Sequence, residues 1–274
     1  MAAPPAGLLG VVGMLACPVC SAALTADAGT LRCPAGHRFD IARQGHVNLL
    51  GHAAPRNADT AVMVAARQRF LDAGHFDPVS DALAANVRGC RRVVDAGGGT
   101  GHHLARALDS SPDAVGLVVD VSVPAARRAA RAHPRMGAVV ADTWRALPVR
   151  SGGADALLCV FAPRNTAEFA RVLAPGGLLV VVTPNPGHLA EARETLGLIG
   201  IQDDKLGAVR RSLAGAFEPV ATRRVHGLLR LTAAEVGDLV AMGPNAFHEH
   251  ATATGPMRVG LDVQVTTFRR PVPR

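Results

Sequence analysis

The apolar residues of this chain change their spacing along its length. Over residues 60–73 and 78–87 they recur at helical intervals, with a break at Gly74. From residue 92 onward, short buried runs such as VVDAGGG, LVVD, VVAD and ALLCVF alternate with segments of helical period. Strands that alternate with helices are typical of a parallel sheet with helices on both faces. The pattern therefore predicts a doubly wound, Rossmann-like α/β fold.

The two ends of the chain are less regular. Residues 1–17 are apolar and rich in small side chains but lack the basic start of a secretory signal, so we expect a ragged tail before the first strand. Near the other end, LTAAEVGDLVAM predicts a helix, and the alternation of VGLDVQVTTFRRP with its final proline predicts an edge strand. No apolar run approaches the roughly 20 residues of a membrane span, which predicts a soluble protein with no membrane partner.

Composition narrows the class of protein. Of 274 residues, 49% are apolar and 19% charged, which excludes a disordered chain and allows two domains of unequal size. The formal charge is +7, and arginine carries nearly all of the positive charge because Lys205 is the only lysine. Guanidinium groups pair bidentately with phosphate, which favours a nucleic-acid partner, although a GC-rich genome would give the same bias. An odd number of cysteines without a signal predicts a reducing, cytoplasmic location, with Cys90 and Cys159 as core residues.

Four candidate metal ligands lie in the segment CPVCSAALTADAGTLRCPAGH. Cys17 and Cys20 bracket two residues, Cys33 and His37 bracket three, and twelve residues separate the two pairs. Each pair can hold one side of a tetrahedral ion, and the spacer is long enough for a hairpin that bends at ADAGT. Four soft ligands with no open position predict a structural zinc site in a small module. Inert buried thiols are the alternative, whereas a redox pair would not need the second pair.

The turn after the first strand of the α/β region carries a candidate cofactor site. In such sheets ligands bind at the carboxyl ends of the strands. Here Asp95, Gly97, Gly99 and Gly101 follow a strand and precede a helix. The last glycine of a dinucleotide-binding fingerprint would fall on His102, and the Gly-Lys-Ser/Thr ending of a phosphate-binding loop is absent. Neither phosphate-containing cofactor is therefore favoured.

Acidic residues that end successive strands indicate a different cofactor. Asp95 can pair with a positive amino group where the glycines let the backbone approach closely. Asp120, at the end of the next strand, is placed to accept two ribose hydroxyls, and Asp142, after the third, can reach an adenine amino group. Together these residues predict S-adenosylmethionine (SAM). Tight turns and helix-capping acids with no ligand are the alternative.

A series of motifs resembles one family. The motifs are CPVC with CPAGHRFD, RQGHVNLL, ARQRFLDAGHF, VVDAGGGTGHHLARAL, ARAHPR, VFAPRN, APGGLLVVVTPNPGHL and VAMGPNAFH, and they cover nearly the whole chain. In these motifs the chain resembles the bacterial 23S ribosomal RNA guanine-N1 methyltransferases, most closely their tylosin-resistance branch. The resemblance implies SAM-dependent methylation of N1 of a guanine in a hairpin loop of domain II, macrolide resistance of the tylosin type, and a homodimer whose zinc modules frame an RNA cleft.

The same resemblance implies a division of the chain and further site residues. Residues 1–52 would form a zinc-binding RNA-recognition module, 53–88 a helical linker and 89–274 the SAM-dependent methyltransferase domain. The matching motif positions place zinc on the four ligands already named, and they place the cofactor on the turn from Gly97 through His102 to His103, on Asp120, on Phe76 and on His188. Phe76 stands where the family often has tyrosine, so a hydroxyl contact is lost while the ring is kept.

The chemistry of N1 methylation suggests where the acceptor base is handled. The N1 proton must be removed, and N1 lies on the pairing edge, so the guanine must be in a loop or flipped out of its stack. FAPRN offers Phe161 to line the pocket and Arg164 to meet phosphate or O6, while MGPNAFHEH offers Phe247 as a stacking face and His248 as a base. Candidate RNA contacts on the helices are Arg67, Arg69, Arg127, Arg128 and Arg131.

Two other functions are compatible with these patterns. A small-molecule methyltransferase can have the same fold, but it would leave the zinc module unexplained. A non-catalytic RNA-binding protein would bind RNA with a steep salt dependence and transfer no methyl group. Drug resistance and routine ribosome maturation are both compatible with an RNA-methylating function.

Overall fold

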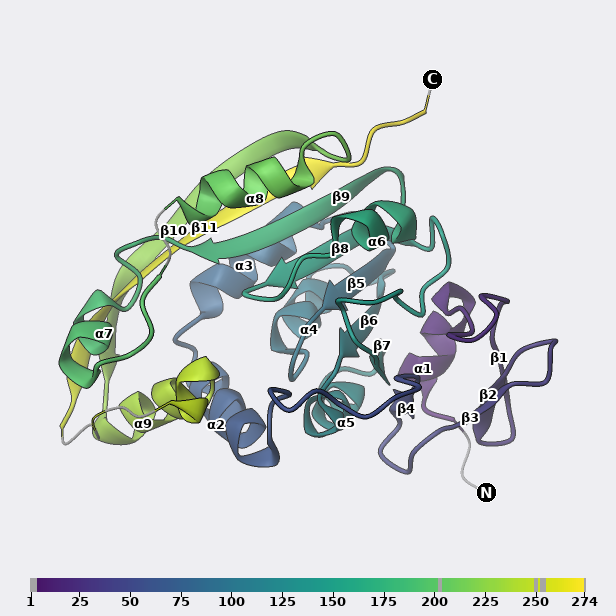
Figure 1. Ribbon diagram of the computed structural model, residues 1–274, viewed down its shortest axis with the longest axis horizontal. Helices are drawn as coiled ribbons and strands as arrows, with labels where there is room; N and C mark the ends of the chain where they lie inside the picture. Colours follow the sequence, from purple (N-terminus) through teal and green to yellow (C-terminus); the bar gives the residue numbers. More distant parts are fainter. Residues whose placement is uncertain (1–3, 202–203, 249–250, 252–254, 274) are drawn as a thin grey trace.

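A central mixed sheet organises the computed structural model, which describes residues 4–201, 204–248, 251 and 255–273. Its strands are β4 (Val47–Asn48), β5 (Arg92–Ala96), β6 (Val115–Asp120), β7 (Met136–Val140), β8 (Ala154–Val160), β9 (Leu173–Pro184), β10 (Glu218–Leu231) and β11 (Met257–Arg269). Within the described ranges they lie in the order β10-β11-β9-β8-β5-β6-β7-β4 (Figure 1). The pairs from β9 to β4 are parallel, and β11 is antiparallel to both of its neighbours.

Helices cover both faces of the sheet, as the alternating pattern predicts. One core contains residues of α2 (Ala61–Asp72), α3 (Asp77–Asn86), α4 (His102–Asp109), α5 (Val123–Ala132), α7 (Ala190–Leu196) and α9 (Ala233–Ala241). The other contains residues of α1 (Ala6–Val11), α6 (Thr166–Val172) and α8 (Lys205–Leu213). The doubly wound fold is confirmed. Among the described residues, no helix combines the length and the apolar character that crossing a membrane requires.

Alternate side chains of a strand belong to different hydrophobic cores, one on each face of the sheet. In β6, Leu117 and Val119 belong to one core and Val118 to the other, because successive side chains of a strand point to opposite faces. All five residues of β7 are buried, which is why the strand reads as a continuous apolar run in the sequence.

The start of the chain is a helix, so the prediction of a ragged tail was wrong. Residues 1–3 lie outside the described residues, but α1 packs on β6 and β7, and Leu8 and Val11 are 1% and 0% exposed. A Cβ on Gly7 would lie 2.3 Å from the carbonyl oxygen of Met136. The helix therefore rests directly on the backbone of β7, a contact that its short, proline-preceded sequence does not reveal.

The prediction of an edge strand at the end of the chain was also wrong. β11 lies inside the sheet between β10 and β9, and β10 is the edge strand. Asp262 and Thr266, two polar positions of that alternation, are 8% and 1% exposed. The polar positions therefore did not mark a solvent-exposed face of an edge strand.

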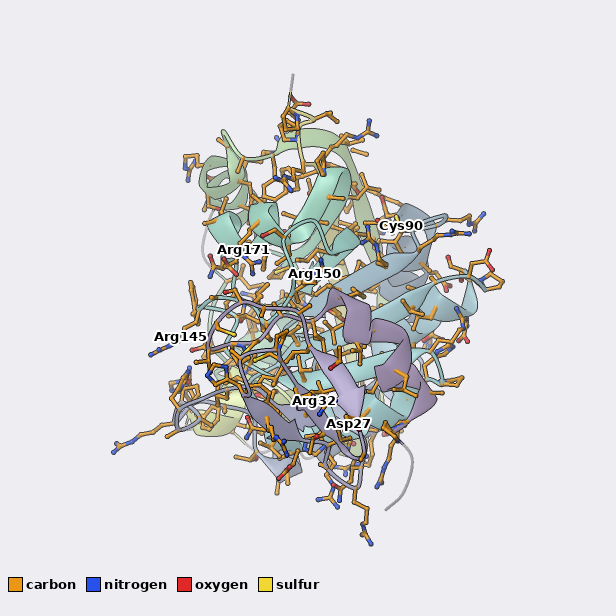
Figure 2. All side chains as sticks on the ribbon, turned by 90° about the vertical axis from the view of Figure 1, so that its right-hand side faces the viewer. Asp27, Arg32, Cys90, Arg145, Arg150 and Arg171 are labelled. Carbon is orange, nitrogen blue, oxygen red and sulfur yellow. The ribbon has the colours of Figure 1, made fainter. Side chains whose placement is uncertain are left out.

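The cysteine-rich segment forms a small sheet that is joined to the large one. Its strands β1 (Thr25–Asp27), β2 (Thr30–Arg32) and β3 (Arg38–Asp40) are antiparallel, and Asp27 pairs with Arg32 at 3.0 Å on the side seen in Figure 2. The following strand, β4, pairs in parallel with β7. Leu31 and Cys33 belong to the same buried cluster as Leu117 of β6. The segment thus adds a strand and core residues to the larger unit.

Replacing Gly7 with Ala tests the contact between α1 and β7. The added methyl group would overlap the Met136 carbonyl, so we expect a loss of about 1–3 kcal/mol in the free energy of unfolding, even though alanine favours a helix. Gly13→Ala is the control, because nothing lies within 4 Å of its added Cβ. Urea unfolding of both variants measures the difference, and equal stabilities would show that α1 does not rest on β7 as described.

Candidate functional site

The four predicted metal ligands converge. The ligand atoms of Cys17, Cys20, Cys33 and His37 all lie within 4.8 Å of one another. The Sγ atoms of Cys20 and Cys33 are 3.6 Å apart, and His37 Nδ1 lies 3.6 Å from Cys17 Sγ and 3.3 Å from Cys33 Sγ. The hairpin of β1 and β2 turns at Ala28 and Gly29, both with positive φ, and so closes the spacer as predicted.

These distances fit a tetrahedral zinc ion. With sulfur at about 2.3 Å and nitrogen at about 2.0 Å from the ion, tetrahedral geometry separates two sulfurs by about 3.8 Å and sulfur from nitrogen by about 3.5 Å. Cys17 and Cys33 are buried, whereas Cys20 is exposed. Three cysteines and one histidine fill every position of such an ion, so the cluster suits a structural metal.

A cavity of about 500 Å³ opens at the carboxyl ends of β5, β6, β7 and β8. Its floor is the turn after β5, and its rim includes residues before α2 and residues of η2 (Pro244–Phe247). The predicted cofactor residues that line it are Phe76, Asp95, Gly97, Gly99, His102, His103, Asp120, Asp142 and His188. The structure therefore brings nearly all of them to one place.

Gly101, the remaining predicted cofactor residue, does not line the cavity itself. It precedes α4 with φ of 78°, and a Cβ there would lie 2.7 Å from Met136 Cε. Gly97, with φ of 76°, would place a Cβ 2.6 Å from Ala162 Cβ. Both positions combine a left-handed backbone with no room for a side chain, which is why the loop needs glycine.

Asp95 is the most unusual group in the cavity. Asp95 is 1% exposed, and both of its carboxylate oxygens are buried without a hydrogen-bond partner in the described part of the chain. Burial, and then the charge of Asp120, raises the pKa of Asp95 to about 7. A buried acid without partners fits a ligand that brings a positive charge or N–H donors.

The other two acids already hold part of the backbone. Asp120 Oδ2 accepts a hydrogen bond from the Gly99 amide, and its Oδ1 accepts one from the Ser122 amide, each at 2.8 Å. Asp142 Oδ1 accepts from the Trp144 amide at 2.9 Å. Each carboxylate keeps free lone pairs for a ligand while it fixes the turn that carries it. These contacts fit ribose and adenine recognition at the ends of β6 and β7.

Aromatic rings form one wall of the cavity. The Phe161 and His188 rings stack with centroids 5.8 Å apart and planes 12° apart, and Phe76 lies about 6 Å from both. Phe161 is 44% exposed and has φ of 52°, an unusual conformation for a bulky residue at the end of a strand. Burial, followed by the charge of Arg193, lowers the pKa of His188 to about 4, so its ring is neutral at pH 7.

The two histidines that begin α4 differ in their surroundings. His103 Nδ1 shares a hydrogen bond of 2.8 Å with Ser80 Oγ. Burial, followed by the charges of His102 and Arg67, lowers the pKa of His103 to about 3. His102 Nε2 lies 3.9 Å from Asp77 Oδ1. His103 is therefore a neutral residue that ties α4 to α3.

Two predicted catalytic residues do not line the cavity. Arg164 directly follows Pro163, which does line it, and is half-buried. His248 is exposed, and its amide donates to the carbonyl of Asn245, a rim residue, at 3.0 Å. Phe247, the expected stacking face, is 45% exposed and also lies outside the lining. All three are close in sequence to residues that line the cavity.

Sequence reasoning missed part of the cavity rim. Arg67 lines the cavity, bonds to the Asp59 carboxylate and to the Met242 carbonyl, and lies over Gly99. Trp144, the single tryptophan, is 68% exposed and also lines the cavity. Arg69 forms a bidentate pair with Asp238, so neither predicted RNA contact of α2 is free. The only sequence feature that pointed to the Arg67–Asp59 pair is the spacing of an acid and an arginine eight positions apart, on either side of the start of α2. Such a spacing is too common to predict a contact.

Replacing Cys33 with Ser tests the metal cluster. We expect zinc content to fall from about one ion per chain to a small fraction of that, and the thermal midpoint to fall with it, because metal binding stabilises a fold this small. Cys90→Ser is the control, since Cys90 is half-buried and outside the cluster. Elemental analysis and thermal unfolding measure both effects. Full zinc content in Cys33→Ser protein would exclude this ligand set.

Family models match both parts of the chain. Residues 15–53 match the model described as "RlmA, N-terminal", a zinc ribbon. Residues 93–177 match the model described as "Methyltransferase domain". A chain of the solved complex between the Haloferax volcanii Trm112 methyltransferase activator and its methyltransferase partner is 18% identical, with a TM-score of 0.53, and covers 78% of this chain and 98% of that one. This last similarity concerns the fold alone.

Full-length relatives carry a more specific name. A Streptomyces fradiae protein named 23S rRNA (guanine(748)-N(1))-methyltransferase is 48% identical over 96% of this chain and 99% of its own length. A Micromonospora griseorubida protein, provisionally named a 23S rRNA (guanine-N(1)-)-methyltransferase, is 50% identical over 94% of this chain and 92% of its own. With the zinc cluster and the strand-end cavity in place, these identities show that the chain belongs to the 23S rRNA (guanine-N1)-methyltransferase family.

Proposed function

We propose that this protein transfers a methyl group from SAM to N1 of a guanine in the domain II hairpin of 23S rRNA. The observation that carries the proposal is Asp95, a buried carboxylate that has no hydrogen-bond partner among the described residues, on the floor of a cavity of about 500 Å³. Bound SAM supplies an electrophilic methyl group on a sulfonium sulfur. The names of the full-length relatives supply the RNA and the atom that is methylated.

The strand-end acids divide the work of holding SAM. Asp95 pairs with the amino group, and the absence of a side chain at Gly97 lets the ligand lie close to the loop backbone. Asp120 accepts the ribose hydroxyls with the lone pairs that Gly99 and Ser122 leave free. Asp142 accepts from the adenine amino group. Phe76, His102, His103 and His188 complete the surface around the cofactor.

The acceptor guanine must leave its stack to enter the cavity. Phe161 offers an exposed aromatic face at the mouth, on which a flipped base can stack. The strained backbone of Phe161 is stabilised by its contact with the His188 ring. The neutral aromatic wall excludes water around the reacting atoms, which favours an in-line displacement between positioned groups.

The N1 proton needs an acceptor, and the O6 charge that forms needs a donor. We assign these roles to His248, three residues after the rim residue Asn245, and to Arg164, directly after the lining residue Pro163. His188 is a poor base because its pKa is about 4. Both assigned side chains have to turn toward the mouth when RNA is bound.

The biological setting follows from the same proposal. Methylation of this hairpin would protect the ribosome from macrolides of the tylosin type, and the substrate places the protein in the cytoplasm. The homodimer implied by the family resemblance is part of the proposal, with a zinc ribbon contributed by each copy.

The pH dependence of cofactor binding tests the role of Asp95. A cationic amino group binds the ionised carboxylate, so protons compete below the pKa of about 7, and the affinity should fall up to tenfold per pH unit below that value and level off above it. Calorimetry with S-adenosylhomocysteine between pH 5.5 and 8 measures the curve. Asp95→Asn should bind more weakly with a flat profile, and an unchanged slope in this variant would remove Asp95 from the site.

Methylation of a defined RNA tests the function itself. With tritiated SAM and the isolated domain II hairpin, we expect label to enter the RNA, and primer extension to stop at the modified guanine because N1 methylation blocks pairing. Asp95→Asn protein should transfer label much more slowly. Turnover of small molecules without RNA would favour a metabolite methyltransferase, and RNA binding without transfer would favour a non-catalytic protein.

A further inference from the structure

A second cavity, of about 810 Å³, lies between α2, α4 and α5. Thr100 and His102, at the start of α4, line both this cavity and the cofactor cavity. α2 separates the two, because Val64 and Gln68 face the second cavity while Arg67 and Leu71 face the first. A ligand in the second cavity would therefore lie beside the methyl-transfer site.

Three arginines of α5 line this second cavity. Arg127, Arg128 and Arg131 are exposed, and no carboxylate pairs with any of them in the described part of the chain. Arg106 of α4 also lines the cavity but is held by Asp81 at 2.8 Å. The helix dipole favours a cation only in the last turn, so it accounts for Arg131 and not for the other two.

The acids of the same cavity belong to other elements. Asp72 accepts a hydrogen bond from Gln68 at 2.7 Å, and Asp77 lies 3.9 Å from His102. Asp109 lies 3.4 Å from His133. These acids stand on α2, α3 and α4, so the unpaired positive charge is confined to the wall formed by α5. Such a wall attracts an anion that approaches from the α5 side.

A turn of the zinc ribbon lies beside this positive wall. It runs from Ala42 to His46, and a Cβ on its Gly45 would lie 2.8 Å from Pro5 Cγ and 3.7 Å from the Ala130 Cβ of α5. His46 is 6% exposed, and burial, followed by the charges of Arg127 and Arg131, lowers its pKa. Arg43 of the same turn is exposed. In Figure 1, α5 lies along the lower edge between α2 and the hairpin of β1 to β3.

We propose that Arg127, Arg128 and Arg131, which we call the α5 arginine face, bind backbone phosphates of the RNA whose guanine enters the cofactor cavity. The inference rests on the proposed function and adds a specific path for the RNA, from the zinc ribbon across α5 to the start of α4. Three unpaired guanidinium groups on one helix face match a series of phosphates better than a single small anion.

The salt dependence of RNA binding tests the proposal. The triple variant Arg127→Ala, Arg128→Ala, Arg131→Ala should bind the domain II hairpin at least tenfold more weakly at 0.15 M salt. The slope of log affinity against log salt should become shallower by roughly 2, because each lost phosphate contact removes about 0.7–0.9. The matched control is Arg223→Ala, Arg230→Ala, Arg258→Ala, which removes three exposed arginines from β10 and β11 and should change neither quantity.

Separate measurements distinguish failure of this proposal from failure of the proposed function. The triple α5 variant should keep its affinity for S-adenosylhomocysteine and its zinc content, and it should methylate at a normal rate once RNA is saturating. Equal losses in the α5 and control variants, or an unchanged slope, would overturn the α5 path while leaving the methyltransferase function intact. A change of oligomeric state in the α5 variant, measured by light scattering, would overturn it in favour of a protein interface.

Discussion

The burial of Asp95 without a hydrogen-bond partner, in the part of the chain that the structure describes, is the constraint on which the rest of the site depends. A carboxylate that is 1% exposed is costly to ionise, and its pKa of about 7 expresses that cost. The neighbouring residues do not compensate the charge of this carboxylate. The glycines supply no side-chain partner, and Asp120 accepts hydrogen bonds from two backbone amides and repels Asp95. A bound cation is the simplest compensation, and this is the basis for the proposed role of Asp95 in holding the cofactor.

The zinc ribbon is part of the methyltransferase unit in packing, although it matches a family model of its own. β4 extends the large sheet, Leu31 and Cys33 are buried in a core shared with β6, and the turn at Gly45 rests on α5. The metal therefore stabilises a surface that is continuous with the catalytic domain. RNA bound to the ribbon would be held at a fixed distance from the cofactor cavity, which a flexibly attached module could not provide.

The rim of the cavity is assembled from distant parts of the chain. Arg67 of α2 joins Asp59 before that helix to the Met242 carbonyl after α9, 175 residues away in sequence. Arg69 and His75 bind Asp238 and Glu235 of α9 in the same way. These pairs fix α9 and the following η2 segment, and with them Asn245 and its neighbours at the mouth. His248, the residue assigned to proton removal, directly follows this segment, so its position depends on ion pairs that have no catalytic role themselves.

The sequence by itself determined what local spacing can express: the four metal ligands, the glycine turn, the three acids at strand ends, and the alternation that specifies a doubly wound sheet. Only the tertiary structure decided what depends on contacts between distant segments. It placed α1 against β7, put β11 inside the sheet, and left Asp95 with no hydrogen-bond partner among the residues described. It also occupied Arg67 and Arg69 with protein acids while leaving Arg127, Arg128 and Arg131 free of them in the described chain. The physical reason is that the spacing of apolar residues along the sequence reflects local helix or strand geometry. Burial and charge pairing depend instead on which distant segments come into contact after folding.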